Sequence, residues 1–242
     1  MSVIHVISTI LLGPLLLWQG KKVRRNTPKL PEAQGPRHGS LVKSACSQRE
    51  QLKILIIGDS SAAGVGADTQ ENALSGQLVK LLSTSYDIEW ALHAKTGAKT
   101  DDGLEWITSL PAERIDYVIS VFGVNDVTSG KTLSNWRRSQ TQFRKLISQR
   151  YPEAMLICCG LPPVHGFPAL PQPLRWYLGR RATQFDNDLK RHTATASKVH
   201  YLDLRFTQDV SKMATDGFHP GPEVYNLWAS KLNSLVMQSN SD

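Results

Sequence analysis

Short apolar runs that alternate with segments of helical periodicity constrain this chain more than any other feature of its sequence. Uninterrupted apolar runs are typical of parallel strands that are buried on both faces of a sheet. We predict strands at residues 53–57, 88–92, 116–122, 154–159 and 199–204. We predict helices at residues 71–83, 101–110, 136–150, 174–197 and 224–237. This alternation predicts an α/β fold in which a parallel five-stranded sheet lies between two layers of helices.

The N-terminal segment has a different character from the rest of the chain. It is apolar from Val3 to Trp18, apart from three polar residues, and a basic cluster follows it. That cluster consists of Lys21, Lys22, Arg24 and Arg25. A membrane helix needs about 20 apolar residues, and a cleaved signal peptide carries its positive charge before the apolar run. We therefore expect residues 1–20 to be an uncleaved anchor, with residues 1–25 at a membrane surface. The alternatives are an export signal and a hydrophobic segment packed on the domain.

Residues 21–50 are predicted to be a basic linker, and residues 51–242 to form the domain. Segment 26–50 contains three prolines and two glycines and has no apolar period. Because basic residues flanking a membrane segment stay on the cytoplasmic side, we expect a cytoplasmic domain. An exported domain, periplasmic or secreted, is the alternative.

The formal net charge of +7 is concentrated near the N-terminus. Residues 1–50 hold eight Lys or Arg and two acidic residues, whereas the rest of the chain holds twenty and nineteen. A protein that binds nucleic acid carries its positive charge on the folded domain. The distribution therefore argues against a nucleic-acid partner.

Ligands of open parallel sheets bind at the carboxyl ends of the strands. This rule points to the loops 58–66, 93–100, 123–130 and 160–173. The first loop contains Gly58-Asp59-Ser60, a turn in which a serine can expose its hydroxyl. A hydroxyl-rich phosphate loop, as in flavin-binding proteins, is the alternative for this segment alone.

A possible base for such a serine occurs near the C-terminus, in Asp216-Gly217-Phe218-His219. Imidazole can accept a proton near neutral pH, and a carboxylate on its other nitrogen fixes the tautomer. The other six histidines have no carboxylate in the same register. Asn125 and Gly97, which follow two of the predicted strands, offer neutral N–H donors for a developing oxyanion. Each motif alone is also compatible with an ordinary surface turn.

Taken in order, these motifs resemble the four sequence blocks of the SGNH hydrolase (GDSL lipase/esterase) family. The resemblance extends from about residue 52 to residue 237. It implies a three-layer α/β/α sandwich, flavodoxin-like, with a parallel five-stranded sheet of order 2-1-3-4-5. It also implies that no metal or organic cofactor is needed. Ser61 stands where the family's fourth letter is leucine, which bears on subgroup and substrate more than on catalysis.

The resemblance also implies roles for individual residues. Ser60 would be the nucleophile, His219 the general base and Asp216 its orienting acid. The oxyanion hole would consist of the Ser60 N–H, the Gly97 N–H and the Asn125 side-chain amide. Asp59 and Asp126 match positions of the motifs, and we interpret both as hydrogen-bond acceptors that shape their loops.

We therefore expect a serine esterase that hydrolyses acyl esters through an acyl-enzyme on Ser60. The apolar, proline-rich segment 161–174 and the N-terminal anchor favour lipid-like substrates, such as lysophospholipids or short-chain fatty esters. Three alternatives remain: a carbohydrate O-deacetylase, an acyltransferase with the same serine, and a non-catalytic membrane-associated binding protein. The sequence predicts no oligomeric state.

Overall fold

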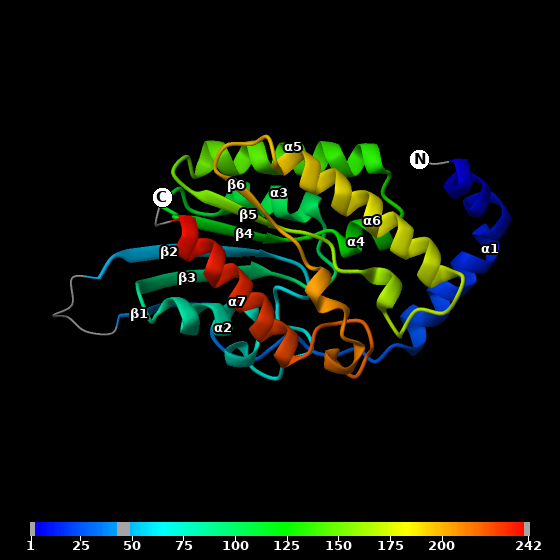
Figure 1. The fold of residues 1–242 in the computed structure, drawn as a ribbon, viewed down its shortest axis with the longest axis horizontal. Helices are drawn as coiled ribbons and strands as arrows, with labels where there is room; N and C mark the ends of the chain where they lie inside the picture. Colours follow the sequence, from blue (N-terminus) through cyan, green and yellow to red (C-terminus); the bar gives the residue numbers. More distant parts are fainter. Residues whose placement is uncertain (1–2, 43–48, 240–242) are drawn as a thin grey trace.

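A six-stranded sheet runs through the middle of the molecule, in a computed structural model that describes residues 3–42 and 49–239 (Figure 1). Its strands are β1 (His38–Leu41), β2 (Gln51–Gly58), β3 (Asp87–Ala94), β4 (Tyr117–Val121), β5 (Met155–Cys159) and β6 (Val199–Leu202). The order is β1-β3-β2-β4-β5-β6, with every neighbouring pair parallel except β1 and β3. The predicted order 2-1-3-4-5 corresponds to β3-β2-β4-β5-β6 and is confirmed.

Helices cover both faces of the sheet (Figure 1). The α-helices of the described residues are α1 (Val3–Asn26), α2 (Leu74–Leu82), α3 (Thr100–Ser109), α4 (Val124–Thr128), α5 (Leu133–Arg150), α6 (Leu174–Thr193) and α7 (Pro222–Ser239). Helices α2 and α7 pack together on one face, whereas α3, α5 and α6 cover the other. The predicted three-layer sandwich is therefore confirmed. The sequence analysis did not predict α4, a helix of five residues that begins directly after β4.

The strands at the centre of the sheet are buried on both faces. All five residues of β4 are buried, and along β2 alternate side chains enter opposite helical layers. Ile54 and Ile56 pack under α2 and α7, while Leu55 and Ile57 pack under the other layer. This alternation follows from the two-residue period of a strand. It explains why the strand sequences are continuous apolar runs instead of alternating ones.

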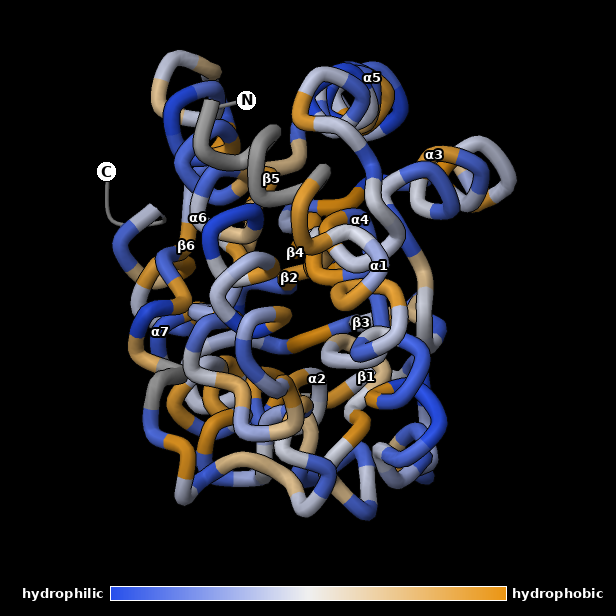
Figure 2. The backbone as a smooth tube through the Cα atoms, turned by 90° about the vertical axis from the view of Figure 1, so that its right-hand side faces the viewer, coloured by the Kyte–Doolittle hydropathy of each residue, from blue (hydrophilic) through white to orange (hydrophobic). Residues whose placement is uncertain are grey.

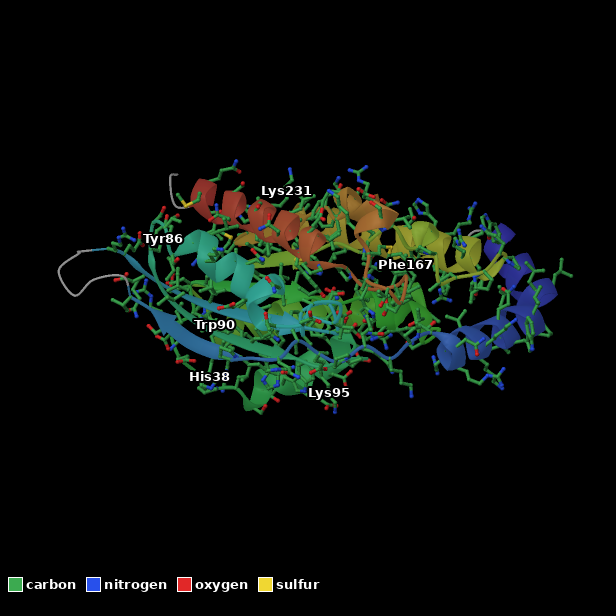
Figure 3. All side chains as sticks on the ribbon, turned by 90° about the horizontal axis from the view of Figure 1, so that it is seen from below. His38, Tyr86, Trp90, Lys95, Phe167 and Lys231 are labelled. Atoms are coloured by element: carbon green, nitrogen blue, oxygen red, sulfur yellow. The ribbon has the colours of Figure 1, made fainter. Side chains whose placement is uncertain are left out.

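The structure differs from the predicted linker over much of its length. Lys21–Asn26 continue helix α1, and His38–Leu41 form the edge strand β1, which pairs antiparallel with β3. His38 and Trp90, from these two strands, are labelled in Figure 3. Strand β1 has no apolar run because it lies at an edge, where main-chain hydrogen bonds to β3 hold it without a buried face. Residues 43–48 of the predicted linker lie outside the described residues.

Helix α1 packs against α6 and the loop before it. Leu16 is buried in the same apolar cluster as residues of α6. The Gln19 side chain donates one hydrogen bond to this region and accepts another from it. Its Nε2 donates to the Gln172 carbonyl (2.7 Å), and its Oε1 accepts from the Leu174 N–H (3.1 Å). Within the described part of the chain, no helix is both long and apolar enough to cross a bilayer. The membrane anchor stays a prediction.

Candidate active site

Three residues from opposite ends of the domain form a continuous hydrogen-bonded chain at the carboxyl edge of the sheet. The His219 Nε2 lies 2.9 Å from the Ser60 Oγ, and its Nδ1 lies 2.5 Å from the Asp216 Oδ2. Ser60 and Asp216 are buried, while His219 is partly exposed. The structure thus brings together the three residues that the sequence predicted as nucleophile, base and acid.

Ser60 lies in the turn that follows β2. The Asp59 Oδ1 accepts the Ser61 N–H (3.0 Å), and the Ser60 carbonyl accepts the Val65 N–H (3.0 Å), so the turn is held from both sides of the serine. Turns continue to residue 66, and no α-helix begins until Leu74. Local hydrogen bonds, not a helix N-terminus, position Ser60.

Asp216 is held as a carboxylate by its own loop. Its Oδ1 accepts the backbone N–H groups of Phe218 (2.9 Å) and His219 (3.0 Å), while its Oδ2 bonds the imidazole. Gly217 makes this arrangement possible, because its φ of +63° lies in the left-handed region and turns the chain back on the aspartate. Burial acts to raise the pKa of Asp216. The bonds from His219 and from the two N–H groups outweigh burial and hold that pKa below its usual range.

Asn125 lies at the start of α4, where Gly123 precedes it with a φ of +136°. Its amide nitrogen donates to the Ala98 carbonyl (3.0 Å) and lies 3.4 Å from the Asp59 Oδ2. The second distance exceeds that of an ordinary N–H···O bond. One amide hydrogen is therefore weakly bound and available to a better acceptor.

Asp59 is a buried carboxyl between the nucleophile turn and Asn125. Burial raises its pKa to about 7, against the opposing effects of the Ser61 N–H and of His219. Asp126 plays a comparable part in the next loop, where its carboxylate accepts from the N–H and hydroxyl of Thr100 and from Lys131. Both residues shape their loops, as the sequence analysis proposed.

Gly97 lies in the turn after β3. Both ends of this turn are hydrogen-bonded to residues at or next to the site. The Lys95 N–H donates to the Gly58 carbonyl (3.2 Å), and the Ala98 carbonyl accepts from Asn125. Gly97 itself is exposed and is absent from the described residues that line the cavity beside Ser60. Its predicted role as an oxyanion donor is not tested by these contacts.

Part of the predicted linker holds this turn in place. The Glu32 Oε1 accepts both the N–H (2.6 Å) and the hydroxyl (2.8 Å) of Thr96, next to Gly97. Arg37 bonds Glu32 and also donates to the Ala94 carbonyl (2.7 Å) at the end of β3. The sequence analysis missed this clamp, because nothing in the local sequence pairs residue 32 with residue 96.

The cavity beside Ser60 and His219 has mostly apolar walls. Its lining includes the predicted loops 58–66, 123–130 and 160–173, but not 93–100. The apolar side chains that line it are Val121, Phe122, Val124, Pro162, Phe167, Leu204, Met213, Phe218, Pro220, Val224 and Trp228. Sequence reasoning missed Leu204, Met213, Val224 and Trp228. Leu204 follows β6, so the strand-end rule could have found it, but the other three reach the cavity only through the tertiary fold.

One histidine outside the site also lies near a carboxylate, at a spacing of four residues instead of three. The His192 Nδ1 lies 3.6 Å from an oxygen of Asp188, one turn earlier on α6. Arg137 occupies the same carboxylate, and no serine hydroxyl is bonded to His192 among the described residues. The His192 Nδ1 lies closer to the Asp188 main-chain carbonyl (2.7 Å), and the pair lacks a nucleophile.

The arrangement can activate a hydroxyl for attack on an electrophilic carbon. The imidazole can take the Ser60 proton, and the ionised Asp216 stabilises the positive charge that results. Among the described residues, no group of three or more His, Cys, Asp or Glu is placed to hold a metal ion.

A family model matches most of this chain. The model of the GDSL-like Lipase/Acylhydrolase family matches residues 56–227. No curated protein of similar sequence is found.

Three solved structures show the same fold at low sequence identity. A carbohydrate esterase family 2 enzyme with a carbohydrate-binding domain, from Corynascus thermopiles (Myceliophthora fergusii), has a TM-score of 0.64 at 15% identity, covering 83% of this chain and 69% of its own. The esterase EstA from Pseudoalteromonas sp. has a TM-score of 0.62 at 19% identity, with coverage of 78% and 99%. An extracellular lipase from Streptomyces rimosus has a TM-score of 0.56 at 16% identity, with coverage of 76% and 99%.

Proposed function

The chain belongs to the GDSL-like lipase/acylhydrolase family and is a hydrolase of ester bonds, and from this premise we propose that it acts through an acyl-enzyme on Ser60. The observation that carries the proposal is the hydrogen-bonded chain from the Ser60 hydroxyl through His219 to Asp216. A serine hydroxyl is a weak nucleophile unless an adjacent base removes its proton. The geometry supplies that base at 2.9 Å and orients it with a carboxylate.

In the first half of the reaction, the Ser60 Oγ attacks the ester carbonyl while its proton passes to the His219 Nε2. The carbonyl oxygen becomes an oxyanion, which the Ser60 N–H, the Gly97 N–H and the Asn125 amide would stabilise. When the intermediate collapses, the C–O bond to the alcohol breaks, and His219 returns the proton to the departing oxygen. The acyl group stays on Ser60 as an ester.

In the second half, water takes the place of the alcohol. His219 accepts a proton from the water as its oxygen attacks the acyl-enzyme, and the same three donors hold the second oxyanion. Collapse releases the carboxylic acid and returns the proton to the Ser60 Oγ. Asp216 stays ionised throughout, in agreement with its lowered pKa.

We expect Asn125→Ala to lower kcat by about 10²–10³-fold with little change in KM, because the amide is needed when the oxyanion forms. Steady-state kinetics on a soluble p-nitrophenyl ester measures this. Asn135→Ala is the matched control, since Asn135 is exposed on α5. An unchanged kcat in a folded Asn125→Ala protein would remove Asn125 from the oxyanion hole.

For the substrate, we propose carboxylic esters with an apolar acyl chain, such as short-chain fatty esters or lysophospholipids. The apolar wall of the cavity, in which Phe167 and Phe218 pack edge to face, supports this choice. Each methylene buried there is worth about 0.8 kcal/mol, or roughly fourfold in kcat/KM. We therefore expect kcat/KM to rise by about an order of magnitude from p-nitrophenyl acetate to the butyrate.

A panel of esters tests this substrate class and its rivals. It comprises p-nitrophenyl esters of increasing chain length, lysophospholipids and acetylated sugars. Cleavage confined to acetyl esters or acetylated sugars would favour a carbohydrate O-deacetylase. A protein of similar fold is named as a carbohydrate esterase, which is why this class is tested. Transfer of the acyl group to an added alcohol or sugar, in preference to water, would instead indicate an acyltransferase.

A further inference from the structure

Helix α1 has two faces, and only one of them is covered by the domain. Leu12, Leu16, Gln19 and Val23 recur at spacings of four, three and four residues and pack toward the domain, and Leu16 and Gln19 are buried. The described side chains on the outer side of the helix are exposed. The exposed apolar residues of this outer side are Leu11 (74% exposed), Leu15 (41%), Leu17 (69%) and Trp18 (57%). We call these four residues the apolar patch of α1.

The outer side of α1 changes from apolar to basic along its length. After Trp18 come Lys21, Lys22, Arg24 and Arg25, all exposed. Within the described residues no carboxylate pairs with any of these four cations, although Lys22 lies over the Trp18 ring (5.1 Å). Four positive charges without a carboxylate partner in the described chain lie beside an apolar patch. A partner that fits this surface is anionic and also accepts apolar side chains.

This surface lies at the functional end of the molecule. Figure 1 shows α1 beyond the carboxyl ends of the parallel strands, and Figure 2 looks onto that end. The two hydrogen bonds of Gln19 join the helix to Gln172 and Leu174. The loop that ends there also supplies Pro162 and Phe167 to the wall of the cavity beside Ser60. Whatever binds α1 is therefore placed close to the loop that borders the site.

We propose that α1 docks this end of the protein on an anionic lipid surface. The apolar patch enters the boundary between headgroups and acyl chains, and the basic cluster contacts lipid phosphates. Because charge is segregated along the helix axis, the N-terminal half lies deeper than the C-terminal half. Trp18 stands at the transition, the depth at which tryptophan is favoured. A protein partner would need an apolar surface next to an acidic one, arranged to match the apolar patch and the basic cluster. An anionic bilayer presents phosphates above acyl chains at every point of its surface.

The test is binding of the full-length protein to vesicles, measured by co-sedimentation. Two compositions are compared, phosphatidylcholine alone and phosphatidylcholine with phosphatidylserine. The Ser60→Ala protein is used beside the wild type, so that hydrolysis of the vesicles does not affect the result and docking is judged independently of the proposed esterase activity. We expect binding to the anionic vesicles that weakens as salt is added.

Two sets of substitutions separate the apolar patch from the basic cluster. Changing Lys21, Lys22, Arg24 and Arg25 to Gln is expected to weaken binding by about 100-fold or more. Changing Leu11, Leu17 and Trp18 to Gln is expected to have an effect of similar size. Neither set touches the catalytic residues, so activity on a soluble ester should be unchanged.

Matched controls carry the same chemical changes elsewhere. For charge, Lys80, Arg138, Lys145 and Lys231 become Gln; all four are exposed and lie on other helices, and Lys231 is labelled on α7 in Figure 3. For apolar surface, three exposed residues outside α1, Leu41, Val210 and Leu227, become Gln. These controls should bind vesicles as the wild type does.

Three outcomes would overturn the proposal. They are a wild-type protein that stays in the supernatant with anionic vesicles, α1 variants that bind no more weakly than their controls, and an α1-dependent dimer in sedimentation velocity without vesicle binding. The last result would make a second copy of this chain the occupant of the apolar patch.

Discussion

Replacing Ser60 by alanine is expected to lower kcat on any cleaved ester by about 10⁶-fold, to the residual rate that binding and oxyanion stabilisation supply. The reason is that no other group can form the acyl-enzyme. The substitution removes one oxygen from a small, buried turn whose backbone bonds involve Asp59, Ser61 and Val65 and not the lost hydroxyl. The protein should therefore fold normally. Steady-state kinetics, with a thermal melt of the same sample, measures both expectations.

The neighbouring serine provides a close control. Ser61 follows the nucleophile directly, and its N–H bonds Asp59, but its hydroxyl is not bonded to His219. Ser61→Ala should keep nearly full activity and should still react with a fluorophosphonate probe, whereas Ser60→Ala should not react. Full activity in Ser60→Ala, or no labelling of the wild type, would contradict the proposed function. The second result would favour a non-catalytic binding protein.

The sequence was sufficient to predict the five parallel strands of the sheet and the Ser60, His219 and Asp216 group at its carboxyl edge. Buried parallel strands need continuous apolar runs, so β2, β4 and β5 could be recognised without knowledge of their neighbours. The strand-end rule then directed attention to the loops that hold Ser60 and Asn125. The Asp216–His219 pair could be recognised because both partners lie in one short loop.

Features that depend on contacts distant in sequence were not predictable. Strand β1 is held by the main chain of β3, and backbone hydrogen bonds leave little trace in side-chain pattern. Glu32 reaches Thr96 across 64 positions, and Met213 and Trp228 reach the cavity through the packing of the C-terminal segment. The Asp188–His192 contact was missed for another reason. A helix brings residues four apart together, whereas the Asp216–His219 pair has the three-residue spacing of a turn.

Acid sensitivity of the site follows from the state of Asp216. Because the pKa of this carboxyl lies below its usual range, it stays ionised on mild acidification. Its stabilising bonds to His219 and to the loop are therefore present at neutral pH and are lost only as pH falls through the lowered value. A decline in activity under mildly acidic conditions, while the fold persists, is therefore not caused by protonation of Asp216.

His219→Gln should be almost as damaging as loss of the nucleophile, with kcat lowered by about 10⁵–10⁶-fold. Glutamine can keep hydrogen bonds to Ser60 and Asp216, but its amide cannot accept and return a proton near neutral pH. A large loss in a protein of unchanged melting temperature would thus assign His219 to proton transfer and not to scaffolding. His192→Gln is the matched control, because it removes an imidazole that also lies beside an aspartate and has no serine. Equal kinetic effects of the two substitutions would contradict the role of His219 as the base.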